Sequence, residues 1–144
     1  IFLALREIRR ANETRRALIV VSDGRENHSR HVRTEALRAA VDTDVRVYAI
    51  ELYPPVGEGV AGPSMLELLA HATGGRYLPT VKRQEIPALI ERIDVHRGYL
   101  LGFTPPVEHR NGKLHEVNLK LRRNVGGQRV KLFWKERYRI PSIL

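Results

Sequence analysis

The run Ala17-Leu18-Ile19-Val20-Val21-Ser22-Asp23-Gly24 decides the fold expected of this chain. Its five apolar residues are too few for a buried helix and rich in β-branched types. They predict a strand covered on both faces, as in a parallel sheet flanked by helices. Asp23 then stands at the carboxyl end of that strand, where open α/β sheets bind their ligands. A turn in which Asp23 caps nearby backbone N–H groups explains the same residues equally well, so both interpretations stay open.

Helical and strand patterns alternate on either side of this run. Helices are predicted over 1–12, from about 29 to 42, from 64 to 73 and from about 86 to 97, and further strands over 45–51 and 76–79. Ser64 and Glu67 have the spacing of a capping box, and Gly74 supplies the helix stop. Such alternation predicts βαβ crossovers and an α/β fold with a doubly wound parallel sheet over residues 1–98.

The pattern changes in residues 99–144. Residues 99–103 read as a strand, Asn111-Gly112 as a tight turn, and residues 117–121 and 130–135 alternate apolar with polar side chains. These signals predict an appended three-stranded antiparallel β-meander with a basic outer face.

Composition limits the possible classes of protein. The 144 residues are one domain's worth or part of one, and 42% hydrophobic with 28% charged residues is typical of a soluble globular protein. No apolar run is long enough for a membrane span, and nothing resembles a signal peptide. The chain has no cysteine, which excludes disulfides and thiolate chemistry. It begins with Ile1 inside a helical pattern, so we expect a fragment.

The net charge of +9 is concentrated at the C-terminal end, where residues 105–144 hold ten Lys and Arg against three Asp and Glu. This basic segment could bind nucleic acid or another polyanion. Trp134, however, falls on the buried face of its strand, and no nucleic-acid motif is present. A solvated strand face is therefore preferred, and polyanion binding is kept as the alternative. Its cations would be Lys120, Arg122, Lys131 and Lys135.

Few residues support an enzyme. No phosphate-binding glycine loop is present, and Arg25 stands where a phosphatase would need a second carboxylate. His28 and His31 could share a helical face as metal ligands, but no third ligand is implied. The other histidines are scattered and read as surface residues. Metal-assisted hydrolysis around Asp23 is the remaining enzymatic possibility.

Three stretches together carry a resemblance to a known family: residues 18–24, residues 45–52, and Ala72-Thr73-Gly74-Gly75-Arg76-Tyr77. In this order they resemble the C-terminal half of a von Willebrand factor type A domain. The closer match is the bacterial VWFA-related family, in which a tail of strands follows the domain. Residues 99–105, 112–115 and 135–138 resemble that tail.

The resemblance implies a non-enzymatic, adhesion-type protein-binding module with Mg²⁺ at the top of the sheet. The ligands in that fold are an Asp-x-Ser-x-Ser loop, a separate Thr, and an Asp in a third loop that Asp23 matches. The first two would precede Ile1, so the site is incomplete here and Mg²⁺ binding should be weak or absent. The implied partner is a protein that presents an acidic residue to the metal; no small-molecule substrate is expected, and nucleic acid is kept only as part of the polyanion alternative. The binding residues expected at this edge of the sheet, in addition to the metal ligand Asp23, are Ser22, Gly24, Asn27 and Ser29.

Two further expectations follow from the resemblance. Family members are often exported, which favours a secreted or periplasmic protein. In the strand order of this fold the fourth strand lies beside the first. Residues 17–22 match the fourth strand, so the missing N-terminal half of the domain would be their neighbour. We therefore expect Ala17–Val21 to be an unguarded sheet edge, prone to association.

Overall fold

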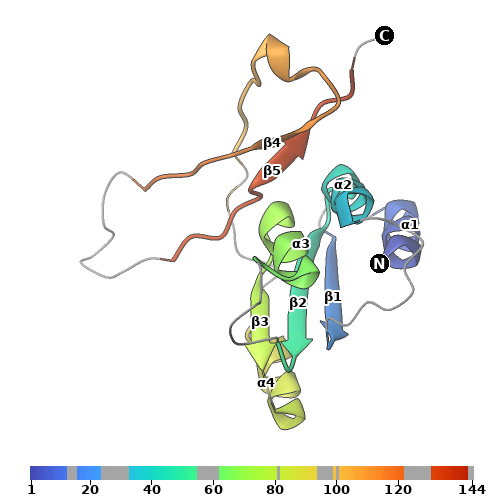
Figure 1. Cartoon of the computed structure of the whole chain (residues 1–144), viewed down its shortest axis with the longest axis vertical. Helices are drawn as coiled ribbons and strands as arrows, with labels where there is room; N and C mark the ends of the chain where they lie inside the picture. The colour runs from blue at the N-terminus through green and yellow to red at the C-terminus, as the bar shows by residue number, and fades with distance from the viewer. Residues whose placement is uncertain are drawn as a thin grey trace.

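The computed structural model describes residues 1–12, 16–23, 33–54, 62–80, 82–93, 99, 101–121 and 131–142. Figure 1 shows an α/β body and a C-terminal arm. The body contains α1 (Phe2–Arg10), β1 (Ala17–Ser22), α2 (Arg33–Thr43), β2 (Arg46–Leu52), α3 (Met65–Thr73), β3 (Tyr77–Thr80), a 3₁₀ turn (Arg83–Glu85) and α4 (Ile86–Glu91). The arm contains a 3₁₀ turn (Val107–His109), β4 (Leu114–Glu116) and β5 (Arg137–Arg139). The predictions made for Gly24, Asn27, Ser29 and Arg122, and for His28 and His31, lie outside the described residues.

The three strands β1, β2 and β3 form a parallel sheet in that order. Ala17 pairs with Arg46 and Ser22 with Glu51, while Ala49 of β2 pairs with Tyr77 of β3. The predicted α/β class and the parallel direction of all three strands are confirmed. The observed bounds of β2 and β3 lie one residue later than predicted.

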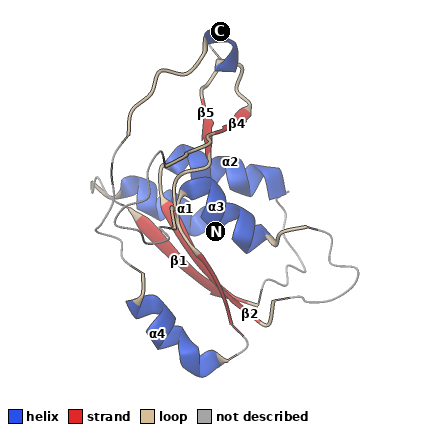
Figure 2. Cartoon of the chain, turned by 90° about the vertical axis from the view of Figure 1, so that its left-hand side faces the viewer, coloured by secondary structure: helices blue, strands red, loops and turns tan. Residues whose placement is uncertain are grey.

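Helices α1, α2 and α3 lie on one side of the sheet and α4 lies on the other (Figure 2). Their core contains Leu5 of α1, Leu37 of α2, Leu69 of α3 and Val47 of β2, against which Leu18 of β1 packs. Because the order β1-β2-β3 runs in one direction, both right-handed crossovers place their helices on the same face. The reversal of strand order that defines a doubly wound sheet does not occur within the described strands and stays a prediction.

The predicted ends of α3 are confirmed. The Ser64 hydroxyl accepts a hydrogen bond from the Glu67 N–H at 3.1 Å, and Gly74 ends the helix in the left-handed conformation (φ 76°). The next residue, Gly75, lies against β2, where an added Cβ would stand 1.9 Å from the carbonyl oxygen of Val47. Only glycine lets the chain turn from α3 into β3 this close to the β2 backbone.

The predicted three-stranded meander is wrong for the residues that the structure describes. The observed sheet has two short antiparallel strands, with Leu114 opposite Arg139 and Glu116 opposite Arg137. Beyond them the segments 117–121 and 131–135 are not strands, and they diverge in Figure 1. Next to the strands the two segments still contact each other, since the Val117 N–H donates to the carbonyl oxygen of Glu136 at 2.8 Å and the Trp134 indole N–H bonds the carbonyl oxygen of Val117. Val117, Leu119, Leu132 and Trp134 are half-buried without a continuous ladder between the two segments, whereas Leu121 is exposed.

Basic side chains attach the arm to the C-terminal end of α2. The Arg139 guanidinium makes two hydrogen bonds to the Asp42 carboxylate, of which the Nε–Oδ1 bond is 2.9 Å long. The Lys135 ammonium donates to Asp44 at 2.8 Å and to the carbonyl oxygen of Val41 at 3.2 Å. Cations at this end of a helix also interact favourably with its dipole. Part of the C-terminal positive charge therefore serves internal packing.

Candidate binding surface at the carboxyl rim of the sheet

Polar residues meet where β1 and β2 end. Ser22 is the last residue of β1 and the register partner of Glu51 in β2, so the two side chains lie on the same face of the sheet. Asp23 follows directly and is exposed. The structure thus places the predicted residues Ser22 and Asp23 at the carboxyl rim, the ligand-binding edge of open α/β sheets.

Glu51 is the residue at this rim that the sequence reasoning missed. Its side chain is only 1% exposed, and its Oε2 accepts hydrogen bonds from the Ser64 hydroxyl at 2.7 Å and the Tyr77 hydroxyl at 2.5 Å. An ionisable group is rarely buried without such partners. Because Ser64 also caps α3, the Glu51 carboxylate joins β2, β3 and the start of α3. The available signal was an acidic residue within the apolar strand Ala49-Ile50-Glu51-Leu52.

Tyr77 is held as a neutral hydrogen-bond donor. Burial raises the pKa of its phenol above the usual value, and the hydrogen bond to the Glu51 carboxylate raises it further. The phenol therefore keeps its proton throughout the physiological range and remains a hydrogen-bond donor to Glu51.

Tyr53 is a second residue that the sequence reasoning missed. It follows β2 with φ at 54°, a left-handed conformation that bulky residues rarely adopt, and it precedes Pro54, a position that normally favours extended backbone. Its N–H donates to the carbonyl oxygen of Thr80 at 2.9 Å, which fixes the turn to the end of β3. The side chain is 50% exposed. The rim thus presents an aromatic side chain on a constrained backbone, one strand away from Asp23.

The possible metal ligands at this rim are oxygen atoms. Mg²⁺ takes oxygen ligands in octahedral geometry, and Asp23, Ser22 and Glu51 supply such oxygens. Yet no three acidic or histidine side chains come together as a possible metal site anywhere in the part of the chain that the structure describes. Glu51 already accepts two hydrogen bonds from hydroxyl groups. Magnesium binding therefore stays a prediction that rests on the resemblance.

The cations of the alternative polyanion surface have different roles. Lys120 and Lys131 are exposed, and the Lys131 ammonium lies 5.2 Å from the centre of the Phe133 ring. Lys135, in contrast, is used in the ion pair with Asp44 rather than lying on a solvated basic face. Phe133 is 44% exposed while Trp134 is half-buried, which agrees with the predicted alternation.

Two histidines that were expected to be separate surface residues come together in the arm. The rings of His109 and His115 stack with centroids 3.8 Å apart. The Tyr138 hydroxyl bonds His109 Nδ1, and His115 Nε2 lies 3.0 Å from Asn111 Oδ1. Phe103 packs edge-on against Tyr138 at 5.1 Å. The cluster fastens the Asn111-Gly112 turn to β5, and spacing alone could not reveal it.

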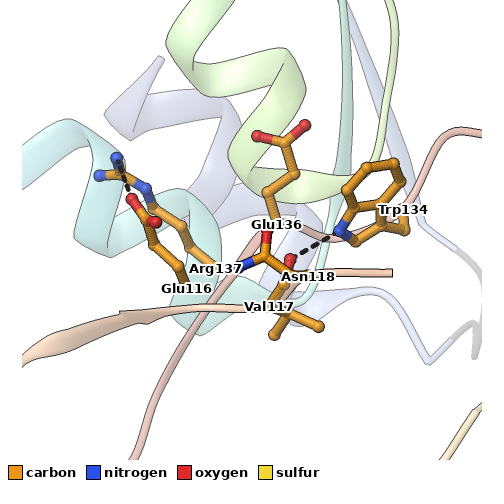
Figure 3. Close-up of a pocket in the computed structure, with 6 residues that line it drawn as sticks. All are labelled: Glu116, Val117, Asn118, Trp134, Glu136 and Arg137. Carbon is orange, nitrogen blue, oxygen red and sulfur yellow. Dashed lines mark hydrogen bonds and ion pairs between the residues drawn. The ribbon is translucent and has the colours of Figure 1, made fainter. Parts of the chain in front are cut away.

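A hollow of about 200 Å³ lies between β4, β5 and the ends of the segments 117–121 and 131–135 that adjoin these strands (Figure 3). Its charged groups are already paired: Glu116 with Arg137 at 3.5 Å, and Glu136 with His71 at 3.2 Å. The Trp134 indole N–H is bonded to Val117. The hollow therefore belongs to the joint between arm and body. Its lining residues are Glu116, Val117, Asn118, Trp134, Glu136 and Arg137.

No protein-family model matches this chain, and no curated protein matches it. A crystal structure of an uncharacterised membrane-spanning protein from Vibrio fischeri is similar over 62% of this chain, with 20% sequence identity and a TM-score of 0.44. The matched part covers 50% of that chain, so this sequence spans about half of its length. In the described part of the present chain, no helix combines the length and apolar character needed to cross a membrane.

Proposed function

We propose that this chain is a non-enzymatic protein-binding module whose partner binds the carboxyl rim of the parallel sheet, at Asp23 and Tyr53. The observation that carries the proposal is the exposed Tyr53 side chain on a left-handed backbone at the end of β2. Backbone strain at an exposed position is typical of functional surfaces. The resemblance to von Willebrand factor type A domains supports the same rim.

A protein partner fits the chemistry of this rim. Tyrosine is among the residues that contribute most to protein–protein binding, because a rigid ring covers a large area and its hydroxyl can still bond. Asp23 adds a charge that can recognise a cationic group or share a metal with the partner. Beneath them, the hydrogen bonds of Glu51 to Ser64 and Tyr77 hold the strand ends in place before binding.

By analogy with the family that the chain resembles, Mg²⁺ bound at Asp23 would offer an open coordination position to a carboxylate of the partner. Ser22 and Asp23 could supply two of its oxygen ligands, and the others would have to come from residues that the described rim does not bring together. We propose that the metal strengthens binding only where those further ligands are supplied. Direct contact with Tyr53 and Asp23 is the part that this chain provides by itself.

A displayed library of random peptides, panned against the immobilised chain with Mg²⁺ or with EDTA, tests the proposal. Selected peptides should lose about tenfold in affinity for the Tyr53→Ala and the Asp23→Ala variants, as expected for contacts at the centre of an interface. Tyr99→Ala is the matched control, because Tyr99 is 93% exposed and lies outside the sheet. Circular dichroism confirms that the variants are folded.

Peptides that bind both rim variants as tightly as the parent chain would contradict the proposal. Failure to select any peptide would also count against it. Selection of acidic peptides whose affinity falls steeply with salt, and falls further in Lys120→Ala with Lys131→Ala, would instead favour the polyanion alternative.

A further inference from the structure

Strand β1 lies at the edge of the parallel sheet. In the described residues it pairs with β2 on one side and with no strand on the other. This arrangement confirms the expected edge at Ala17–Val21. The strand is composed of β-branched and aliphatic residues that are typical of the interior of a sheet.

The direction of the backbone groups on this edge follows from one hydrogen bond. The Arg46 N–H donates to the carbonyl oxygen of Arg16 at 3.1 Å. The backbone N–H and C=O groups of the even-numbered residues of β1 therefore point toward β2. The N–H and C=O groups of Ala17, Ile19 and Val21 therefore point out of the sheet along its free edge. The strand offers three residues, each with a donor and an acceptor, for pairing with another strand.

The side chains on this edge do not protect it. Natural edge strands are guarded by charges, prolines or bulges, and the residues from Ala17 to Val21 include no charge and no proline. Ile19 is 41% exposed and Val21 is 44% exposed, on the face of the sheet away from α1–α3. Their register partners in β2, Tyr48 and Ile50, are buried. The apolar face is thus covered at β2 and open at β1.

We propose that β1 is a homotypic interface, in which two copies of this chain pair antiparallel through their β1 strands about a two-fold axis at Ile19. Ile19 of one copy then faces Ile19 of the other, and Ala17 faces Val21. Within the strand bounds this register uses all three outward residues of each copy, and it makes six hydrogen bonds. The product is one continuous six-stranded sheet with β1 at its centre.

A second copy suits this edge better than an arbitrary strand because the edge is complementary to itself. Its outward groups are symmetric about Ile19, as a two-fold interface requires. Arg16 stands before the strand, half-buried with its guanidinium donating to the carbonyl oxygen of Ile8, and Asp23 stands after it, so antiparallel pairing brings the basic start of one copy toward the acidic end of the other. The open Ile19 and Val21 side chains of both copies would form one apolar patch across the axis.

Sedimentation equilibrium of the whole chain and its variants tests this interface. The parent chain should form a dimer, and Ile19→Pro should raise the dimer dissociation constant at least about tenfold. Proline removes an N–H that points outward, so the ladder between β1 and β2 keeps its hydrogen bonds. Ile19→Thr is the matched control, because threonine keeps the N–H and the β-branched shape; its dissociation constant should stay within about threefold of the parent's. Ile19→Lys places a charge on the same edge and should also dissociate the dimer.

Cysteine cross-linking tests the register, since the chain has no cysteine of its own. Ile19→Cys should form a disulfide-linked dimer, because facing Cα atoms lie about 5.5 Å apart, within disulfide range. Ala17→Cys alone should not cross-link, since its two copies would lie about 14 Å apart along the strands. A mixture of the Ala17→Cys and Val21→Cys variants should form a disulfide-linked dimer that contains one copy of each variant.

Several results would overturn the proposal. A parent chain that stays monomeric at the highest concentration it tolerates excludes the homotypic interface. A dimer that persists unchanged in folded Ile19→Pro and Ile19→Lys variants places the contact elsewhere. Cross-linking of Ala17→Cys with itself at the efficiency of Ile19→Cys excludes the register. Thermal melts of each variant separate loss of pairing from loss of folding.

Discussion

The Tyr77 hydroxyl on β3 donates a 2.5 Å hydrogen bond to the Glu51 carboxylate on the neighbouring strand β2, and Glu51 is almost fully buried. The phenol stays protonated beside this carboxylate because burial and the hydrogen bond both raise its pKa. The pair holds together the strand ends beneath the proposed binding rim. Its chemistry leads to the first prediction.

Replacing Tyr77 with phenylalanine should lower the free energy of unfolding by about 1–2 kcal/mol at neutral pH, because the buried carboxylate loses a donor. It should also change the dependence on pH. In the parent chain the folded state holds the Tyr77 proton more tightly than the unfolded state. The stability from this group is therefore complete below a pH of about 10 and is lost as the pH rises above it. Tyr77→Phe should lose that part of the alkaline decline.

Urea unfolding at neutral and alkaline pH measures both effects, and titration of tyrosinate absorbance should lose its last step in Tyr77→Phe. Tyr53→Phe is the control, because the Tyr53 side chain is half exposed to solvent. The same alkaline decline in the parent chain and in Tyr77→Phe would argue against the assignment.

Gly75→Ala should destabilise the fold by about 3 kcal/mol, because the new methyl group would overlap the carbonyl group of Val47. Gly102→Ala is the matched control, since an added Cβ there meets nothing within 4 Å. Its effect should stay within about 0.5 kcal/mol. Denaturant unfolding measures the free energy of unfolding of the two variants. Equal values for Gly75→Ala and Gly102→Ala would contradict the close approach of the Gly75 backbone to β2.

The ion pair between Arg139 and Asp42 should contribute measurably to attachment of the arm. Its side chains are 27% and 23% exposed and are joined by two hydrogen bonds, so a double-mutant cycle with Arg139→Met and Asp42→Asn should give a coupling of about 1 kcal/mol.

The pair of Arg137 with Glu116 is the comparison, because Glu116 is 72% exposed and the atoms are 3.5 Å apart. Its coupling should be close to zero in the same cycle. Added salt should reduce the difference between the two pairs. A coupling for Arg137 with Glu116 as large as that for Arg139 with Asp42 would contradict the prediction.

We expect this chain alone to bind Mg²⁺ weakly or not at all, because a single carboxylate at Asp23 has little affinity for a cation that dehydrates reluctantly. Titration calorimetry of the parent chain and of Asp23→Ala checks this. Binding in the micromolar range that disappears in Asp23→Ala would disprove the prediction. It would also show that the rim contains a complete metal site.

Local sequence patterns predicted the body of the fold well. The β-branched run at 17–21 forms β1, and Ser64 and Gly74 begin and end α3 as predicted. Such features depend on a residue and its near neighbours, and tertiary contacts reinforce them. The alternating pattern after residue 98 was misleading, because Val117, Leu119, Leu132 and Trp134 are half-buried in segments that do not form the predicted strands.

Some features of the rim follow from the sequence, and others follow only from the tertiary structure. The sequence by itself determined that Asp23 follows an apolar strand, and therefore that it lies at the carboxyl edge of a parallel sheet; the predicted cover on both faces of that strand is wrong, because Ile19 and Val21 are exposed on one face. Only the tertiary structure decided that Glu51 is buried beneath it, and that Tyr53 stands beside it on a left-handed backbone. Those features depend on Tyr77 and Thr80, which lie more than twenty residues further along the chain. Hydrogen bonds between such distant residues leave no periodic signal, because neither partner's position fixes the other until the strands align.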